Sequence, residues 1–245
     1  MTDPTISYMI CATPRSGSTL LCEALRNTGL AGNPDEYFGP MHVARWTEKW
    51  QTQSETDYLE KVMAHGSGEN GVWGVKVMRL YWQNVIDQLR RVQGSVEMSD
   101  VELLNVCFPN LQFIWVTRRN KVRQAMSWLK FVQGAAWYWE DDKPQTLDRL
   151  EFRPDVIEKF MVETAVHETA WLEFFRQVNV QPYVVVYEDF VNAYEGTAKN
   201  LLTYLGIAYP ENLDFGERRI KKQADGLTDE WVEKYLLLFK KTESM

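Results

Sequence analysis

The sequence predicts an α/β fold in which a parallel sheet carries helices on both faces, and three observations support this. Short apolar segments rich in β-branched and aromatic residues recur along the chain, as expected for buried strands. Helical patterns lie between these segments, and strands that alternate with helices form parallel sheets. Hydrophobic residues make up 45% and charged residues 25% of the 245 positions, which is an ordinary globular composition.

The expected elements follow in chain order. Strands are expected at 6–12, 72–77, 111–117 and 183–187. Helices are expected from about residue 20 to Gly29, at about 121–133, at 192–205 and at 228–239. We expect residues 1–245 to form a single domain with two insertions, at about 33–60 and at about 134–155, the second of them a mobile loop.

Charge and composition exclude several classes of protein. A net charge of −7 argues against a nucleic-acid or membrane-surface partner, although it allows a local basic pocket. No apolar run reaches the ~18 residues of a membrane span, and the first residues lack the pattern of a secretory signal. The three cysteines form no CxxC pair, and the three histidines show no metal-ligand spacing. We therefore expect a reduced, cytoplasmic protein without a protein-held metal.

A loop suited to anions separates the first strand from the first helix. Unpaired N–H groups and the helix dipole favour negative charge at such a position. The candidate contacts are Arg15, Ser16, Gly17, Ser18 and Thr19. The loop has the shape of a nucleotide P-loop, but Ala12 and Ser18 stand where GxxxxGK[ST] has its first glycine and its lysine, which argues against a triphosphate. The alternative is a helix start that is merely rich in capping residues.

A second anion site is expected after the third strand. That strand runs directly into Arg118, and Ser127 follows nine residues later in the next helix. Ligands of parallel sheets bind beyond the carboxyl ends of the strands, so the two sites should be neighbours. Two separated phosphate sites fit a nucleoside 3′,5′-bisphosphate. The alternative is an arginine and a serine that simply face water.

These residues resemble those of a known enzyme family. The loop 15–19 is similar to the 5′-phosphosulfate loop of sulfotransferases that use 3′-phosphoadenosine-5′-phosphosulfate (PAPS). Arg118 with Ser127 is similar to their 3′-phosphate motif. Several segments more narrowly resemble the bacterial trehalose 2-sulfotransferase family: 15–21, 32–38, 71–76, 223–225 and 229–231.

The resemblance implies a P-loop-like sulfotransferase fold and a reaction. It implies transfer of a sulfuryl group from PAPS to a hydroxyl of a small acceptor, a carbohydrate such as trehalose or a glycolipid sugar, with PAP as the product. It also implies a homodimer. The two insertions would then lie on the acceptor side, and residues 223–225 would cover the adenine and ribose.

Two residues are candidates for the chemistry. The resemblance makes Glu36 the base that takes the hydroxyl proton, with the adjacent Asp35 as the competing assignment. Lys76, at the end of the second strand, is placed to stabilise charge on the leaving phosphate. Its alternative role is that of a strand-end lysine that reaches water. The resemblance also implies acceptor contacts from Asn33, Tyr37 and Phe38.

Two other functions stay open at this point. One is a small-molecule kinase of the P-loop fold, against which the missing loop lysine counts. The other is a non-catalytic 3′-phosphonucleotide-binding protein, which would bind the nucleotide and transfer nothing. Arg119 departs from the sequence usual in the wider family and would add positive charge beside the 3′-phosphate site.

Overall fold

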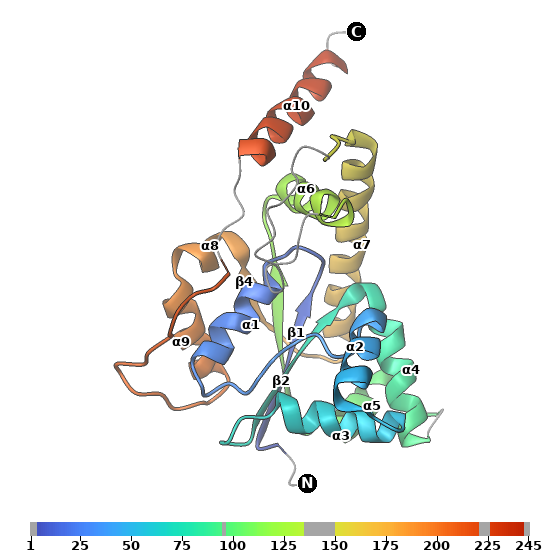
Figure 1. The fold of residues 1–245 in the computed structure, drawn as a ribbon, viewed down its shortest axis with the longest axis vertical. Coiled ribbons are helices and arrows are strands. Elements are labelled where there is room, and N and C mark those ends of the chain that lie inside the picture. Colours follow the sequence, from blue (N-terminus) through green and yellow to red (C-terminus); the bar gives the residue numbers. More distant parts are fainter. Residues whose placement is uncertain (1–3, 95–96, 135–149, 221–225, 243–245) are drawn as a thin grey trace.

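A four-stranded parallel sheet forms the centre of the protein, in the order β2-β1-β3-β4. The computed structural model describes residues 4–94, 97–134, 150–220 and 226–242 (Figure 1). The strands are β1 (Ile6–Ala12), β2 (Val72–Met78), β3 (Leu111–Thr117) and β4 (Tyr183–Val186). The predicted α/β class with a parallel sheet is confirmed.

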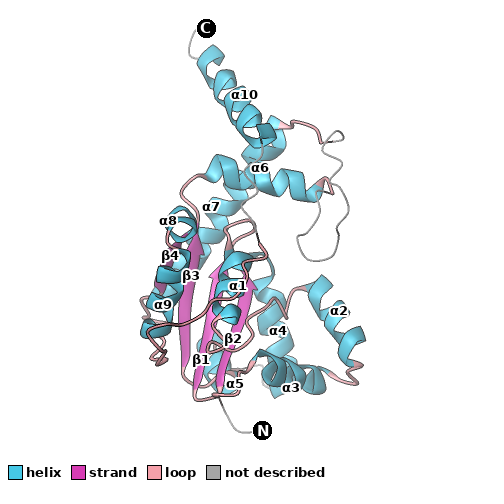
Figure 2. Ribbon diagram, turned by 60° about the vertical axis from the view of Figure 1, so that its left-hand side comes forward, coloured by secondary structure: helices cyan, strands magenta, loops and turns pink. Residues whose placement is uncertain are grey.

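Helices cover both faces of this sheet (Figure 2). They are α1 (Ser18–Asn27), α2 (Pro40–Trp50), α3 (Glu55–Gly66), the 3-10 helix η1 (Arg79–Tyr81), α4 (Trp82–Gln93), α5 (Asp100–Cys107), α6 (Lys121–Val132), α7 (Pro154–Gln177), α8 (Tyr187–Asn192), α9 (Tyr194–Tyr204) and α10 (Gly226–Thr242). α1 and α9 pack on one face, and α4, α5 and the end of α7 pack on the other.

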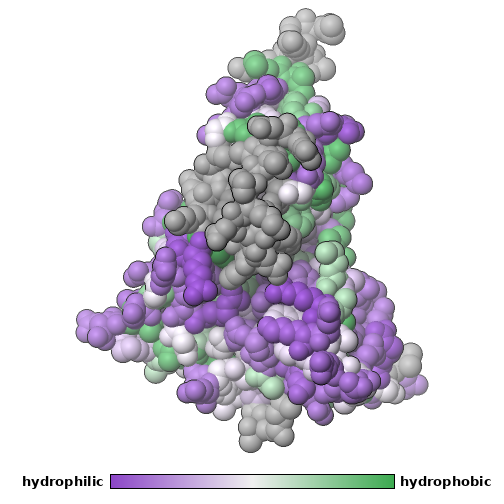
Figure 3. All heavy atoms as spheres, viewed as in Figure 1, coloured by the Kyte–Doolittle hydropathy of each residue, from purple (hydrophilic) through white to green (hydrophobic). Residues whose placement is uncertain are grey.

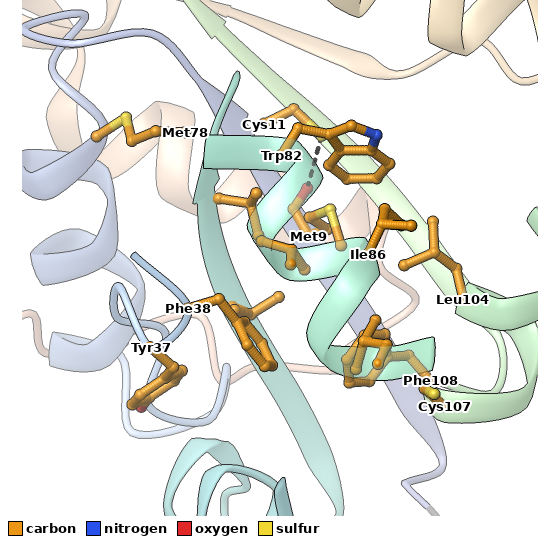
Figure 4. Close-up of a cluster of buried hydrophobic side chains, with 14 of the residues drawn as sticks. Met9, Cys11, Tyr37, Phe38, Met78, Trp82, Ile86, Leu104, Cys107 and Phe108 are labelled. Carbon is orange, nitrogen blue, oxygen red and sulfur yellow. Dashed lines mark hydrogen bonds between the residues drawn. The ribbon is translucent and has the colours of Figure 1, made fainter. Parts of the chain in front are cut away.

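The alternation of side chains along β1 explains why both faces are covered. Tyr8 and Ile10 point into the core under α1 and α9, whereas Met9 and Cys11 point into the core under α4 and α5. All four are fully buried, so an apolar strand without polar alternation can only sit inside two layers of helices. Figure 4 shows the second of these cores, where Met9 and Cys11 lie near Trp82 of α4.

A third core joins α6, α7 and α10 beyond the sheet. Trp128 of α6 stacks on Phe160 of α7 with ring centroids 4.3 Å apart, and Trp231 of α10 is buried in the same cluster. α10 then extends away from the sheet (Figure 1). In the view of Figure 3, hydrophobic residues show mainly on the upper part of the surface, beside hydrophilic ones, whereas the lower part is mostly hydrophilic. The exposed apolar side chains of α7 include Val162 and Val166.

The elements differ from the expected ones at a few places. β4 is one residue shorter than predicted because Tyr187 begins α8, and the helix expected at 192–205 starts at Tyr194. The first predicted insertion contains α2 and the start of α3, and the sequence pattern predicts neither α4, α5 nor α7. Residues 135–149, most of the second insertion, and residues 223–225 lie outside the described residues. Within the described ranges, no helix has the length and apolar character needed to cross a membrane.

Close packing of β1 on β2 requires glycine at position 74. A Cβ there would lie 2.4 Å from the ring of Tyr8, whose hydroxyl donates a hydrogen bond to the Ala31 carbonyl at 2.7 Å. We predict that Gly74→Ala lowers the free energy of unfolding by about 1–3 kcal/mol, as overpacked cores do. Urea denaturation measures this change.

The same substitution at Gly196 is the matched control. Gly196 lies within α9, and a Cβ there meets nothing within 4 Å. Gly196→Ala should therefore raise the free energy of unfolding by about 0.5–1 kcal/mol, because alanine loses less conformational freedom in a helix. Equal effects of the two substitutions would contradict the packing argument.

Candidate active site

The loop after β1 has the geometry of an anion cradle. Arg15 and Gly17 both adopt left-handed conformations, with φ of 60° and 94°, and Gly17 immediately precedes the first residue of α1. The first turn of α1 contains no acidic residue. The Ser16 hydroxyl is buried and has no hydrogen-bond partner among the described residues. A buried hydroxyl without a partner is costly, so this group is suited to a ligand.

Two helices hold the loop in this shape. Gln124 of α6 donates from Nε2 to the Thr13 hydroxyl at 3.0 Å and to the Pro14 carbonyl at 2.8 Å. Trp171 of α7 donates from Nε1 to the carbonyl of Ala12, the last residue of β1, at 3.0 Å. All three contacts are buried or partly buried, so the loop conformation is fixed before any ligand arrives.

The predicted second site lies against this loop. Arg15 Nε donates to Ser127 Oγ at 2.9 Å, which joins the loop to α6. A Cβ on Gly17 would lie 2.3 Å from the ring of Tyr187, so only glycine fits there. The Arg118 guanidinium lies 4.6 Å from the centroid of the same ring. Tyr187 therefore contacts the loop and approaches Arg118.

Arg118 is a largely buried arginine whose ion pair with Glu188 is long. Its side chain is 15% exposed, and its Nε has no hydrogen-bond partner among the described residues. The nearest carboxylate oxygen in an ion pair with it, Glu188 Oε1, is 3.8 Å from this Nε. Burial lowers the pKa of Arg118, and the negative charge of neighbours works against this. A desolvated guanidinium gains most from an anionic partner with several oxygens.

Arg119 does not add free positive charge here. Its side chain is exposed and forms an ion pair with Asp189, and its backbone N–H donates to Glu188 Oε2 at 2.9 Å. Asp189 therefore compensates the charge that the sequence analysis expected beside the second anion site. The reason is the position of α8, whose acidic first turn lies next to the end of β3.

A buried carboxylate and a buried lysine form the second part of the site. Glu36 and Lys76 are 4% and 2% exposed, and Glu36 Oε2 lies 2.7 Å from Lys76 Nζ. Lys76 Nζ also donates to the hydroxyl of Thr19, in the first turn of α1, at 3.2 Å. His42 Nε2 lies 3.3 Å from the other carboxylate oxygen of Glu36. One lysine thus touches both the loop and the carboxylate.

Charge pairing decides the protonation of these two residues. Burial works to raise the pKa of Glu36, but Lys76 and His42 outweigh it and lower the pKa from 4.5 to about 2. Burial works to lower the pKa of Lys76, but Glu36 outweighs it and the pKa of Lys76 is raised. Both groups are therefore charged at neutral pH.

The backbone around Glu36 separates it from its acidic neighbour. The Lys76 N–H donates to the Asp35 carbonyl at 2.9 Å, so the segment runs beside β2. The Asp35 side chain is 42% exposed and turns toward Arg26, whereas Glu36 turns inward. Trp46 donates from Nε1 to the Glu36 carbonyl at 3.3 Å. Of the two candidate bases, only Glu36 lies next to the lysine and the loop.

Two of the three predicted acceptor contacts lie deeper than expected. Tyr37 and Phe38 are 0% and 1% exposed and belong to the hydrophobic core, whereas Asn33 is half-buried. The Tyr37 hydroxyl donates to the Asn33 carbonyl, and the Asn33 side chain hydrogen-bonds to His65 Nε2 at 2.9 Å. The Tyr37 ring packs against Trp46 and Trp50 of α2, and the Phe38 ring packs against Phe108 at the end of α5. In this arrangement, these residues support the segment that carries Glu36.

The site also contains residues that the sequence did not predict. Tyr81 lies beside Gly39 and His42, and its buried hydroxyl has no hydrogen-bond partner among the described residues. The sequence position of Gln124 could have indicated the site, since it precedes Ser127 by three positions on one helix face. That of Tyr187 could have done so too, because it follows β4 at the edge where the other strands end. No sequence pattern indicates His42 or Tyr81, since their position depends on how α2 packs.

The fold and this site, an anion loop beside a buried lysine–carboxylate pair, define a group-transfer enzyme. The chain belongs to the Stf0 sulphotransferase family, whose model matches residues 7–237. The resemblance to sulfotransferases inferred from the loop and the later segments is confirmed.

Two curated relatives extend over almost the whole chain. The trehalose 2-sulfotransferase of Mycolicibacterium smegmatis is 28% identical, with 96% of each chain covered. That of Mycobacterium tuberculosis is 26% identical, with 93% of each covered. A sulfotransferase of known structure from Alicyclobacillus acidocaldarius has 13% identity and a TM-score of 0.46, over 97% of this chain and 96% of its own.

No group of three or more histidine, cysteine, aspartate or glutamate side chains in the described part of the chain is arranged to hold a metal ion. That chemistry proceeds without a metal stays a prediction.

The low pKa of Glu36 makes stability depend on pH in a defined direction. A carboxyl whose pKa is lower in the folded state stabilises the protein above its unfolded pKa, and this stabilisation is lost as pH falls. The stabilisation by Glu36 is lost over the pH range from about 4.5 down to about 2. We predict that the difference in unfolding free energy between the wild type and Glu36→Gln shrinks across this window, as measured by denaturation at stepped pH.

Lys76→Met tests the cause of this shift. Without the lysine, burial should dominate and raise the pKa of Glu36 above its value in the wild type. Carboxyl carbon NMR measures that pKa directly, and Asp35→Asn is the control that leaves the Glu36–Lys76 pair in place. An unchanged Glu36 titration in Lys76→Met would contradict the pairing argument.

Proposed function

We propose that the protein transfers the sulfuryl group of PAPS to a hydroxyl of a carbohydrate and releases PAP. One observation carries this proposal: Lys76 Nζ bridges Thr19 of the anion loop and Glu36, at 3.2 Å and 2.7 Å. A group that binds the donor and a group that takes the acceptor proton thus meet at one amine. The names of the two curated relatives make trehalose the first acceptor to test.

The loop and α6 offer donors to both phosphates of such a nucleotide. The N–H groups of the loop, with Ser16 and Arg15, would hold the 5′-phosphosulfate. Arg118 and Ser127 would hold the 3′-phosphate. Ser127 Oγ accepts its hydrogen bond from Arg15, so its own proton is still available to donate to a phosphate oxygen.

The transfer step needs little beyond position and charge. The acceptor oxygen attacks sulfur as the bond from sulfur to the bridging phosphate oxygen breaks, and the bonding electron pair goes to that oxygen. Lys76 would stabilise the resulting negative charge, and Glu36 would take the hydroxyl proton. Tyr81 and His42 lie on the Glu36 side of this arrangement and are candidates to contact the acceptor.

The ion pair gives the base a condition for activity. A carboxylate with a pKa of about 2 is a weak base while Lys76 and His42 hold it. Negative charge from the donor would compete for Lys76, and a lysine drawn toward phosphate would stabilise the Glu36 anion less. The pKa of Glu36 would then rise when the donor is bound. Glu36 would then be a stronger base in the complex with the donor than in the free protein.

An assay with sulfur-labelled PAPS tests the proposal. We expect labelled product with trehalose or another sugar of a panel that includes glycolipid headgroups, and an equal rate after chelation of divalent metals. Phosphate transfer from ATP that requires magnesium would instead favour the kinase, which the family assignment makes the weaker alternative. Tight binding of PAP with no transfer to any sugar would favour the non-catalytic nucleotide-binding protein.

Glu36→Gln tests the base. It keeps the size and much of the hydrogen bonding of the side chain, and general base catalysis supplies about 10²–10⁴-fold, so kcat should fall by that factor. Nucleotide affinity should not weaken, because Lys76 loses the carboxylate that competes for it. Asp35→Asn is the matched control, since its carboxylate is exposed, and should keep most of the activity. The reverse ranking would exclude Glu36 as the base.

Arg118→Met tests the 3′-phosphate site. Loss of a charge-assisted hydrogen bond typically costs about 1.5–3 kcal/mol, which is roughly 10- to 150-fold in affinity. We expect the variant to lose this factor for PAP and much less for adenosine 5′-phosphosulfate, which lacks the 3′-phosphate. Calorimetry measures both. Arg119→Met is the control, because Asp189 already pairs with that charge, and equal losses for both nucleotides in Arg118→Met would contradict the assignment.

A further inference from the structure

A small recess lies at the start of α4, just after the end of β2. It has a volume of about 260 Å³ and is lined by Arg79, Leu80, Trp82, Gln83, His167 and Ala170. None of these residues has a part in the proposed transfer, and within the described ranges none of them is hydrogen-bonded or ion-paired to Glu36 or Lys76.

Arg79 lines this recess and forms no ion pair within the described ranges. Its guanidinium lies 5.6 Å and 5.5 Å from the ring centroids of Trp82 and Trp171. Its Nε is buried and has no hydrogen-bond partner among the described residues. The nearby carboxylate of Asp100 already pairs with Arg90 at 2.7 Å. Indole faces attract a cation but accept no hydrogen bonds in the guanidinium plane, so Arg79 still requires acceptors.

His167 brings a second unpaired polar group. Its Nδ1 is buried and has no hydrogen-bond partner among the described residues. Burial lowers the pKa of His167, so the ring is neutral at pH 7 and has one N–H to donate. Among its charged neighbours, Glu163 raises this pKa and Arg79 lowers it. Beside the recess, α4 begins without an acidic residue in its first turn.

We propose that this recess binds an oxyanion, with Arg79 as the charge partner and His167 as a hydrogen-bond donor. A sulfate, phosphate or carboxylate group supplies the acceptors that both side chains lack. The walls made by Trp82 and Leu80 leave room for an organic body attached to that group. Arg79 follows Lys76 by three residues, so the two backbone positions are at most about 11 Å apart.

The indole N–H signal of Trp82 in NMR spectra provides a local test, whereas the indole N–H of Trp171 is bonded to Ala12 at the anion loop and would also respond to sulfate bound there. In the full chain, added inorganic sulfate should shift the Trp82 signal and saturate, while the signal of Trp231, in the core of α6, α7 and α10, serves as an internal reference. Arg79→Met should weaken this sulfate affinity by at least about 10-fold, as expected for a lost charge-assisted bond. Arg45→Met is the matched control, because Arg45 also lies over an indole, 5.4 Å from the Trp46 ring.

The outcomes are distinct. A Trp82 signal that does not respond to sulfate, or a sulfate affinity that is equal in Arg79→Met and the wild type, would overturn the proposal. Arg79→Lys keeps the charge without the planar donors, so its sulfate affinity should lie between those of the wild type and Arg79→Met. This variant provides the test if the methionine variant does not fold. The readout is an indole signal and not turnover, so it succeeds or fails independently of the proposed sulfuryl transfer.

Two sources of the oxyanion are separated by a second titration. Glucose 6-phosphate and glucose 6-sulfate are compared with inorganic phosphate and sulfate on the same signals. Sugar esters that bind at least about 10-fold more tightly than the free ions assign the recess to an organic anion, because the additional contacts come from its walls. Equal affinities assign it to the free ion.

Discussion

The ion pair between Glu36 and Lys76 is the interaction on which the rest of the site depends. Two charges that are 4% and 2% exposed are tolerated inside a protein only as partners, and removal of one leaves the other uncompensated. The pair fixes the segment of Glu36 against β2, where the Lys76 N–H also binds the Asp35 carbonyl. Through Thr19 it also fixes the start of α1. Strand, segment and loop are thereby held in one arrangement.

The strand order determines which residues lie on either side of the anion loop. β1 lies between β2 and β3, so the anion loop after β1 has Lys76 on one side and Arg118 on the other. Tyr187, which follows β4, packs on Gly17 and under Arg118 and so joins the last strand to the loop. A ligand with two phosphates can extend from the loop toward β3, which leaves the β2 side for the molecule that reacts.

Short sequence patterns predicted the elements whose position depends mainly on neighbouring residues in the chain. The four strands were placed to within one residue or so because buried parallel strands are short apolar runs. Arg118 and Ser127 could be placed beside the loop because parallel strands end at one edge. The Glu36–Lys76 pair joins residues 40 positions apart, and no periodicity encodes such a contact. Tyr37 packs against α2, and Phe38 packs against Phe108 at the end of α5, so their burial depends on contacts between distant segments.

Unpaired polar atoms mark the same edge of the sheet independently of any motif. Folded proteins pair nearly all of their buried donors and acceptors. Each of the three neighbouring strands β1, β2 and β3 is nevertheless followed, within four residues, by a buried atom with no hydrogen-bond partner in the described part of the chain: Ser16 Oγ, Arg79 Nε and Arg118 Nε. Two are arginine nitrogens and one is a hydroxyl, all of which can donate to oxygen. Other unpaired atoms, such as Ser7 Oγ near the start of β1, lie elsewhere, so an unpaired atom does not by itself establish an anion site, and these three donors are consistent with the proposed sites.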